Sequence, residues 1–400
     1  MKAQIIILLC KIRDMFRTLS FYLNALRYPM KPVRGITIVA NLSDGASLSK
    51  VMRDLAYALR SAGIPFQTYN LARRSSVFPK DVDGILTQRK DFRALRFTHI
   101  VGMGKYPFPR LKGTRCTIIS FWEADSGYEE VHKDILLRAD ILVGMSDFNV
   151  DYFNKLAASY DKKSLKILYP FRFPPAALPQ TEIVRHKYGL PIDAFVVFFN
   201  FDIVSIERKN AAGVIRAFAK AFPSETDVHL VFKTMHAELF PEALHKLYRL
   251  AQEVGISDRF SMINEYVPQL DLYGLTNACD AYISLHRGEG FGLGVAEAMA
   301  MGKPVVVTNW SATTEFCNDA NSISVPYTMI VPDKKDHLQL LFKNVTAWAD
   351  ADIKVAASAL RRLYKTPTLQ KELGQNARLF MHEHFSLERF KVHINALLDS

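Results

Sequence analysis

Short runs of apolar residues alternate along most of the chain with stretches in which apolar residues recur every three or four positions. The short runs are typical of strands buried in a parallel sheet, and the longer stretches are typical of helices that cover it. In the first half the expected strands are Gly35–Asn41, Thr98–Met103, Cys116–Ser120, Asp140–Ser146 and Leu165–Pro170. In the second half they are Ala194–Asn200, Val228–Lys233, Phe260–Asn264, Asp280–Leu285 and Lys303–Thr308.

Stretches with helical periodicity separate these runs. The clearest cover Leu48–Ala62, Ala211–Ala221, Pro241–Val254 and Leu293–Met301. Strands that alternate with helices in this way predict doubly wound α/β domains, which bind ligands at the carboxyl ends of their strands.

The length of the chain indicates two domains, because 400 residues exceed what one hydrophobic core usually holds. Four prolines fall within residues 170–179, a density that interrupts periodic structure and predicts a linker. We therefore expect an N-terminal Rossmann-like domain over residues 35–178 and a C-terminal one over residues 179–384. The last segment, residues 385–400, contains an amphipathic helical pattern at Ser386–Leu398.

Residues 1–34 form a separate basic segment. Its first apolar run, Ala3–Cys10, is too short to span a bilayer as a helix, and no small-residue cleavage site follows it. After Lys11, apolar residues recur with helical spacing, and arginines lie among them. Two interpretations stay open, namely a helix at an anionic membrane surface and a helix that packs on its own domain.

The charge of the chain narrows the classes of partner. The chain has 51 basic and 40 acidic residues and a formal net charge of +11, so an anionic partner is expected: nucleic acid, anionic lipid or a phosphorylated ligand. The basic residues are dispersed instead of interleaved with aromatic ones along one face, which argues against nucleic acid. The four cysteines lie singly, which argues against a disulfide framework or a zinc site and fits a reducing cytoplasm.

The segment His286–Trp310 carries the strongest chemical signal. Glycines occupy positions 288, 290, 292 and 294, and a helical pattern follows directly. Glycines let backbone N–H groups approach a ligand, and the first turn of a helix offers unpaired donors, which suits a diphosphate. Carboxylates at Glu289 and Glu297 would repel phosphate, so sugar hydroxyls are their expected targets. The segment therefore predicts a nucleotide-sugar site, and the alternative is a glycine-rich turn that serves packing alone.

This segment closely resembles the Glu-x7-Glu signature of the retaining GT-B glycosyltransferases of glycosyltransferase family 4. The resemblance extends to Phe201–Phe222, which is similar to the family's phosphate-binding strand-loop-helix, to Asn321–Tyr327 and, more loosely, to Phe121–Phe153. It implies the GT-B fold, in which two Rossmann-like domains face each other across a cleft and the last helix crosses back to the N-terminal domain. It also implies a retaining hexosyltransferase whose donor substrate is a nucleotide-diphosphate sugar, with no cofactor.

The resemblance assigns roles to residues that match the family's motifs. Arg208 and Lys209 would hold the donor diphosphate, and Glu289 would contact the hydroxyls of the transferred sugar. Backbone amides expected to face the sugar and phosphates belong to Gly290, Phe291, Gly292 and Leu293. Residues expected at the nucleoside are Glu297 at the ribose, and Tyr266 and Val267 at the base, with a core or rim position as the alternative for Tyr266.

The acceptor is expected on the N-terminal domain. Candidate residues there are Gly45, Trp122, Glu123 and Asp125. His132 is a further candidate for a general base, with a packed or solvated histidine as the alternative.

The sequence gives little indication of the donor sugar or of a metal site. The segment Thr308–Phe316 replaces a version that is often glycine-rich in the family, so the sequence does not identify the donor sugar. The carboxylate pairs in Asp81–Asp83 and Asp350–Asp352 do not end apolar strands, so no metal site is expected.

The predicted function is transfer of a hexosyl unit to a glycan or lipid-linked glycan in cell-surface polysaccharide biosynthesis. The expected location is the cytoplasm, or the inner face of the cytoplasmic membrane as a peripheral protein. One alternative is a catalytically silent glycosyltransferase-like subunit that supports a partner enzyme, and a weaker one is a nucleic-acid-binding protein. The intact set of Arg208, Lys209, Glu289 and Glu297 favours the enzyme.

Overall fold

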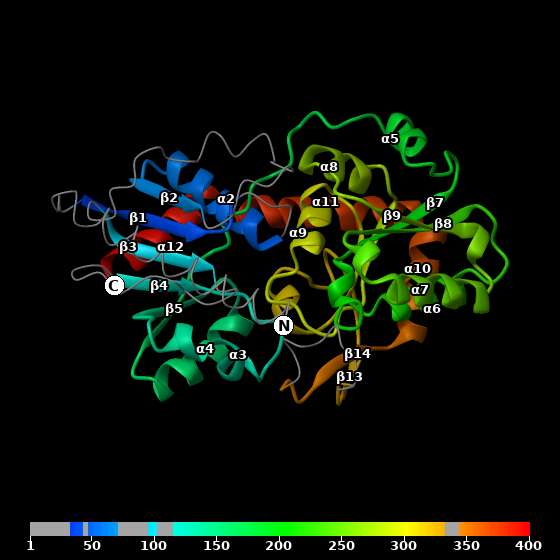
Figure 1. Cartoon of the computed structure of the whole chain (residues 1–400). Coiled ribbons are helices and arrows are strands. Elements are labelled where there is room, and N and C mark those ends of the chain that lie inside the picture. Colours follow the sequence, from blue (N-terminus) through cyan, green and yellow to red (C-terminus); the bar gives the residue numbers. More distant parts are fainter. Residues whose placement is uncertain (1–32, 43–46, 71–94, 102–114, 333–343) are drawn as a thin grey trace. The chain divides into compact units, whose positions relative to one another are not determined.

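The computed structural model describes residues 33–42, 47–70, 95–101, 115–332 and 344–400 (Figure 1). These residues form two compact units. Unit 1 comprises the described residues within Met1–Phe121, Tyr128–Arg172 and Leu387–Ser400, and unit 2 comprises those within Trp122–Gly127 and Phe173–Ser386. In this described part of the chain, no helix is both long and apolar enough to cross a bilayer.

Unit 1 is built on a parallel sheet in the order β2-β1-β3-β4-β5-β6. Its strands are β1 (Val33–Ala40), β2 (Phe66–Asn70), β3 (Leu95–Val101), β4 (Arg115–Ile119), β5 (Ile141–Gly144) and β6 (Lys163–Lys166). Its helices are α2 (Ser47–Ser61), α3 (Tyr128–Leu136), α4 (Asp147–Ser159) and α12 (Leu387–Asp399). The C-terminal helix α12 packs against α2, and Figure 1 shows it in red beside the blue and cyan strands.

Unit 2 has its own parallel sheet, in the order β12-β11-β10-β7-β8-β9, and a separate antiparallel ribbon of β13 and β14. Its strands are β7 (Phe195–Asn200), β8 (Val228–Thr234), β9 (Phe260–Asn264), β10 (Ala281–Ser284), β11 (Val305–Thr308), β12 (Ile323–Val325), β13 (Tyr327–Ile330) and β14 (Trp348–Ala351). Its α-helices are α5 (Thr181–Lys187), α6 (Ala211–Ala221), α7 (Pro241–Glu253), α8 (Gln269–Asn277), α9 (Leu293–Ala300), α10 (Ile353–Lys365) and α11 (Pro367–His384). Short 3₁₀ turns lie at Ile203–Ser205, Ala237–Leu239, Ser257–Arg259 and Ser311–Glu315.

The two parallel sheets and their helices confirm the predicted α/β class. One expected strand needs correction. The strand expected at Leu165–Pro170 instead spans Lys163–Lys166, because it pairs in register with β5, whose last residue, Gly144, lies opposite Lys166. The ribbon of β13 and β14 was not predicted, and in it Asp350 pairs with Thr328 across the strands.

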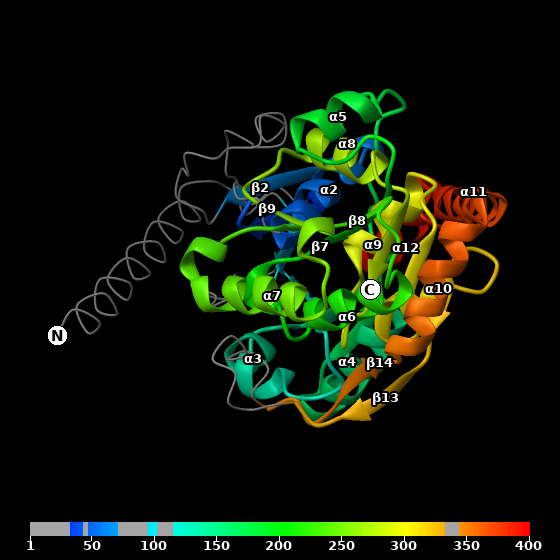
Figure 2. The ribbon, with the colours of Figure 1, turned by 90° about the vertical axis from the view of Figure 1, so that its right-hand side faces the viewer.

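Helix α6 shows how the local sequence sets an element of unit 2. Asn210 adopts a left-handed backbone with φ of 55° and caps the helix, since its side chain accepts a hydrogen bond from the Gly213 amide. A Cβ on Gly213 would lie 2.5 Å from the Asn210 side chain, so only glycine fits there. The apolar face that follows is buried against the sheet, and α6 also packs on α10, which lies next to α11 in Figure 2.

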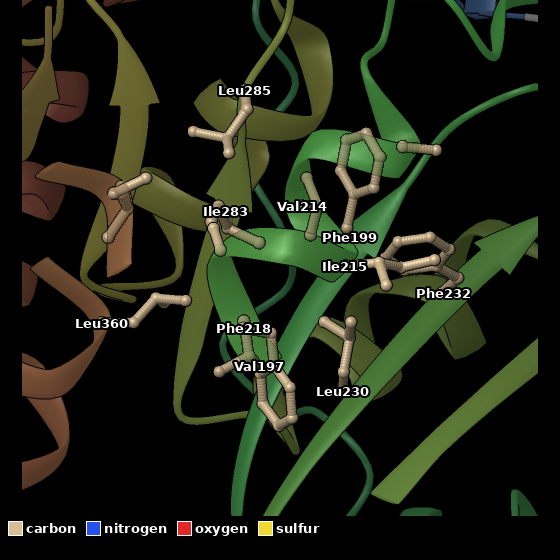
Figure 3. Close-up of a cluster of buried hydrophobic side chains, with 14 of the residues drawn as sticks. Val197, Phe199, Val214, Ile215, Phe218, Leu230, Phe232, Ile283, Leu285 and Leu360 are labelled. Atoms are coloured by element: carbon tan, nitrogen blue, oxygen red, sulfur yellow. The ribbon is translucent and has the colours of Figure 1, made fainter. Parts of the chain in front are cut away.

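The core of unit 2 fills the space between its sheet and these helices. Figure 3 shows Val214, Ile215 and Phe218 of α6 pointing toward side chains of β7, β8 and β10. Strand β7 is buried over Val196–Phe199 because both faces of the parallel sheet are covered. This core holds the carboxyl ends of β7 and β10 in fixed positions.

We expect Ile283→Val to lower the free energy of unfolding by about 1 kcal/mol, because it removes one methyl group from a side chain that is 0% exposed in this core. Chemical denaturation measures the change. The matched control is Ile183→Val on α5, whose side chain is 61% exposed. An equal loss in both variants would contradict the assignment of Ile283 to the core.

Candidate active site

Two loops of unit 2 leave its sheet at the same point. Strand β7 has β8 on one side and β10 on the other, so the order of strands reverses between β7 and β10. Loops at the carboxyl ends of strands around such a reversal form the usual ligand site of a doubly wound sheet. The loop after β7 carries Arg208 and Lys209, and the loop after β10 carries Glu289.

The loop after β7 is held by its own backbone. Asp202 caps the 3₁₀ turn by accepting a hydrogen bond from the Val204 amide, and the Lys209 amide donates to the Ser205 carbonyl. Arg208 and Lys209 therefore directly precede the α6 cap, Asn210. Cations at a helix start oppose the helix dipole, so this position favours an anionic ligand beside them.

The loop after β10 depends on two glycines. A Cβ on Gly288 would lie 1.8 Å from the backbone carbonyl oxygen of Glu123. Gly292 has φ of 91° and precedes the first residue of α9, and a Cβ there would lie 2.5 Å from the Thr313 side chain. Close packing therefore requires glycine at both positions.

Glu289 is fixed from the opposite side by the segment after β11. Its amide donates to the Ser311 hydroxyl at 2.9 Å, and its carbonyl accepts from the Ala312 amide at 3.3 Å. Ser311 has φ of 62°, a left-handed conformation that is uncommon outside glycine. The predicted site did not include Ser311. The available signal was that Ser311 lies in Thr308–Phe316, the segment that replaces a version often glycine-rich in the family.

The three predicted catalytic residues meet in unit 2. Lys209 Nζ donates to Glu289 Oε1, and Arg208 Nη1 lies 3.7 Å from Glu289 Oε2. Arg208 also donates to the Gly288 carbonyl at 2.8 Å and to the Ser205 hydroxyl at 3.2 Å. The guanidinium therefore joins both loops.

Burial and charge act in opposite directions on this cluster. Burial raises the pKa of Glu289, but the attraction of Lys209 and Arg208 outweighs it and lowers that pKa to about 2. Burial lowers the pKa of Lys209, against the attraction of Glu289. Glu289 is thus ionised at neutral pH.

Glu123 joins the same cluster. Its Oε1 lies 3.3 Å from Arg208 Nη2, and its side chain is 23% exposed. We expected the segment around Glu123 within the N-terminal domain, but Trp122–Gly127 packs as part of unit 2 because its backbone lies against Gly288. Trp122, expected at the ligand, is buried and donates its indole N–H to the Ser126 carbonyl, whereas Asp125 is exposed.

His286 is an orienting residue in this geometry. It is fully buried, with Nε2 3.1 Å from the Trp310 carbonyl and Nδ1 3.1 Å from the Ser284 hydroxyl. A carbonyl only accepts, so Nε2 carries the proton and Nδ1 accepts from Ser284. Burial lowers the pKa of His286 to about 4, so the ring is neutral at pH 7 and ties the two segments together.

The residues expected at the nucleoside occupy the adjacent elements of unit 2. Glu297 lies in α9, is 5% exposed and accepts a hydrogen bond from the Gln269 side chain of α8 at 3.1 Å. Val267 is buried and Tyr266 is half-buried in the loop after β9. Gln269 was not predicted. The role of Glu297 at the ribose and those of Tyr266 and Val267 at the base stay predictions.

The remaining candidates have separate outcomes. Gly45 and Asp81–Asp83 lie outside the described residues. His132 is 7% exposed at a kink in α3, and its ring lies tilted against that of Tyr128, with 4.5 Å between the centroids. Burial lowers its pKa to about 4, so it is the packed histidine given as the alternative. Among the described residues, no group of three or more His, Cys, Asp or Glu side chains could hold a metal ion.

Arg287 extends the cluster to the β13–β14 ribbon. Its Nη2 lies 2.8 Å from Asp350 Oδ1, and its Nη1 donates to the Glu207 carbonyl at 2.9 Å. Its amide donates to the Arg208 carbonyl at 2.7 Å. Asp350 therefore pairs with an arginine, and Asp352 caps α10, so both carboxylates of that pair have structural partners.

Comparisons with known proteins identify glycosyl transferases as similar to this chain. Residues 204–380 match the family described as Glycosyl transferases group 1. The serotype-specific mannosyltransferase WbdA of Escherichia coli is 31% identical over 133 residues, or 33% of this chain and 16% of that protein. The O-antigen chain mannosyltransferase B of Escherichia coli is 28% identical over 212 residues, or 50% of this chain and 51% of that protein. The matched part of the chain thus spans about a sixth of the length of the first curated relative and about half of the second.

Solved structures resemble both units. A glycosyltransferase from Rickettsia africae ESF-5 has a TM-score of 0.64 at 15% identity, over 92% of this chain and 98% of that one. HepE of Anabaena, in complex with UDP and glucose, has a TM-score of 0.63 at 14% identity, over 92% of this chain and 99% of that one. Residues 204–380 thus match the group 1 glycosyl transferases, in a chain that has two Rossmann-like units, as in the GT-B fold.

Proposed function

We propose that this protein is a retaining glycosyltransferase that moves a hexosyl unit from a nucleotide-diphosphate sugar to a glycan or lipid-linked glycan acceptor. The observation that carries the proposal is the meeting of Arg208, Lys209 and Glu289 at the strand reversal of unit 2, in the loops that precede α6 and α9. Two cations beside a helix N-terminus suit a diphosphate, and an ionised carboxylate next to them suits sugar hydroxyls.

The diphosphate would join Glu289 as a partner of the two cations. In the structure the Glu289 carboxylate forms ion pairs with both Lys209 and Arg208. Phosphate oxygens that share these cations would leave carboxylate lone pairs of Glu289 to accept hydrogen bonds from the sugar. During transfer, negative charge grows on the leaving diphosphate, and preorganised cations stabilise that charge most. We therefore propose transfer without a metal ion.

Retention of configuration follows from how the acceptor reaches the sugar. Glu289 is bound to two cations, and we assign no side chain as a nucleophile at the anomeric carbon. In the proposed reaction the acceptor hydroxyl attacks on the face that the diphosphate leaves. The bond from the anomeric carbon to the diphosphate oxygen breaks, the diphosphate keeps the electron pair, and it takes the acceptor proton.

The relatives suggest the class of product. Their names describe a serotype-specific mannosyltransferase, an O-antigen chain mannosyltransferase and, in Rhizobium meliloti, a mannosyltransferase of lipopolysaccharide core biosynthesis. We propose transfer of a mannosyl unit to a cell-surface polysaccharide precursor at the inner face of the cytoplasmic membrane. Residues 1–34, with their basic amphipathic pattern, would contact the anionic lipid there, and they lie mostly outside the described residues.

A nucleotide screen tests the donor site. Thermal shift and calorimetry with UDP, GDP, ADP, dTDP and CMP should show stabilisation by one nucleotide, because a ligand that binds only the native state raises the melting temperature. Glu297→Ala should weaken that binding by about 10-fold or more, since it removes hydrogen bonds to a charged group.

The matched control is Glu242→Ala, an exposed carboxylate of α7, which should bind like the parent protein. Stabilisation by none of the nucleotides would overturn the proposal and favour a catalytically silent subunit. Equal binding by Glu297→Ala and Glu242→Ala would remove Glu297 from the nucleotide site.

A further inference from the structure

Two carboxylates share one guanidinium in unit 2. Glu289 Oε2 lies 3.7 Å from Arg208 Nη1, and Glu123 Oε1 lies 3.3 Å from Arg208 Nη2. Glu123 is held there by its own backbone, whose carbonyl oxygen packs so closely on Gly288 that a Cβ would not fit. Both terminal nitrogens of the guanidinium, which are expected to meet phosphate, therefore have a carboxylate beside them.

The charged side chains of this cluster balance one another. The charged groups that act on Glu123 are Arg208, Lys209 and Glu289, so two cations face two carboxylates. The diphosphate of a nucleotide sugar adds two negative charges. An unbalanced negative charge in a buried site is costly, and a carboxyl group avoids the cost by taking up a proton.

Geometry indicates which carboxylate takes that proton. Among the described residues, Glu289 forms ion pairs with both of these cations, whereas Glu123 forms one with Arg208. Burial raises the pKa of Glu123 and the nearby charge of Glu289 raises it further, against the attraction of Arg208. The pKa of Glu289 is lowered to about 2 by its two partners. The pKa values of the two carboxyl groups are thus shifted in opposite directions, and Glu123 takes up a proton more readily than Glu289.

We propose that Glu123 takes up a proton from solvent when the diphosphate of a nucleotide sugar binds at Arg208, and that its protonated carboxyl then donates a hydrogen bond to a phosphate oxygen. The inference rests on the proposed donor site and adds a residue to it. Glu123 thereby changes from a competitor for Arg208 into a third donor for the diphosphate. No other bond forms or breaks in this step.

Calorimetry of the full chain with UDP-glucose and GDP-mannose tests the inference. Both diphosphates are esterified at each end and do not titrate near neutral pH, so a proton taken up belongs to the protein. Titrations in buffers of different ionisation heat should give uptake approaching one proton, and affinity should fall about tenfold per pH unit where uptake is complete.

Variants of Glu123 locate the proton. Glu123→Gln keeps a donor without titrating, so it should bind without uptake, with an affinity that does not change with pH. Glu123→Ala, which has no donor, should also bind without uptake but more weakly than Glu123→Gln. Glu242→Gln, the same change on the exposed face of α7, should keep the full uptake.

The outcomes separate the inference from the proposed function. Failure of both nucleotide sugars to bind would overturn the donor site and the inference together. Binding without proton uptake in the parent protein would overturn the inference alone, even if every Glu123 variant misfolded. Undiminished uptake in Glu123→Gln would likewise overturn it, because the proton would then lie on another group.

Discussion

Replacing Glu289 with alanine is expected to lower the free energy of unfolding of unit 2 by about 3 kcal/mol and the rate of glycosyl transfer by about 10²–10³-fold. The loss of stability follows from burial, because Lys209 and Arg208 would keep their charges in a buried site without the carboxylate that balances them. The loss of activity follows if Glu289 holds the transferred sugar.

A nucleoside diphosphate should reverse the loss of stability in Glu289→Ala without restoring activity. Its phosphates supply the negative charge that the variant lacks, so the nucleotide should raise the melting temperature of Glu289→Ala more than that of the parent protein. The matched control is Glu225→Ala, which also removes a carboxylate paired with an arginine, Arg361, outside the site. A smaller nucleotide shift in Glu289→Ala than in Glu225→Ala would contradict the view that Glu289 and the diphosphate share the same cations.

The pH dependence of the Glu289 contribution has a definite sign. The pKa of Glu289 in the folded protein is about 2, below its usual value of 4.5. The stabilisation is therefore fully present above about pH 4.5 and is lost as the pH falls toward about 2. Acid titration of the melting temperature should show a loss in this window that Glu289→Ala lacks.

Apolar patterns predicted the central strands well because both faces of a parallel sheet are covered. Strands β7, β10 and β11 are buried along most of their length, so their sequences are continuous apolar runs. The pattern failed where burial is incomplete. The edge strand β6 has the sequence KSLK with no fully buried residue, and β13 exposes Met329. Such strands depend on their partners, which local periodicity does not reveal.

The candidate site was predictable as far as its motifs are local. The glycine pattern and Glu289 lie in one segment, whereas the contact of Lys209 with Glu289 joins residues 80 apart through the order of β7 and β10. The contact of Glu123 with Arg208 could not be predicted, because Trp122–Gly127 leaves the strand of one unit and packs within the other. Ser311 and Arg287 were missed because their roles are hydrogen bonds made across the fold.

Replacing Arg208 with lysine is expected to weaken nucleoside diphosphate binding by about 10–100-fold and to lower the rate of transfer by about 10²-fold or more. Lysine keeps the charge, but one ammonium group cannot reproduce a planar fork that donates to the Gly288 carbonyl and the Ser205 hydroxyl while facing two carboxylates. Both loops would lose the side chain that joins them. The control is Arg216→Lys, the same substitution on the exposed face of α6.

Calorimetry of the two variants separates charge from geometry. If net positive charge alone attracted the diphosphate, Arg208→Lys and Arg216→Lys would bind with equal affinity, and the fork would carry no specific role. We expect only Arg208→Lys to lose affinity, with an unfavourable change in binding enthalpy, because the missing contacts are directional hydrogen bonds. That result would also explain why the loop after β7 presents an arginine and a lysine side by side: the arginine fixes the positions of the two loops, and the lysine adds charge next to Glu289.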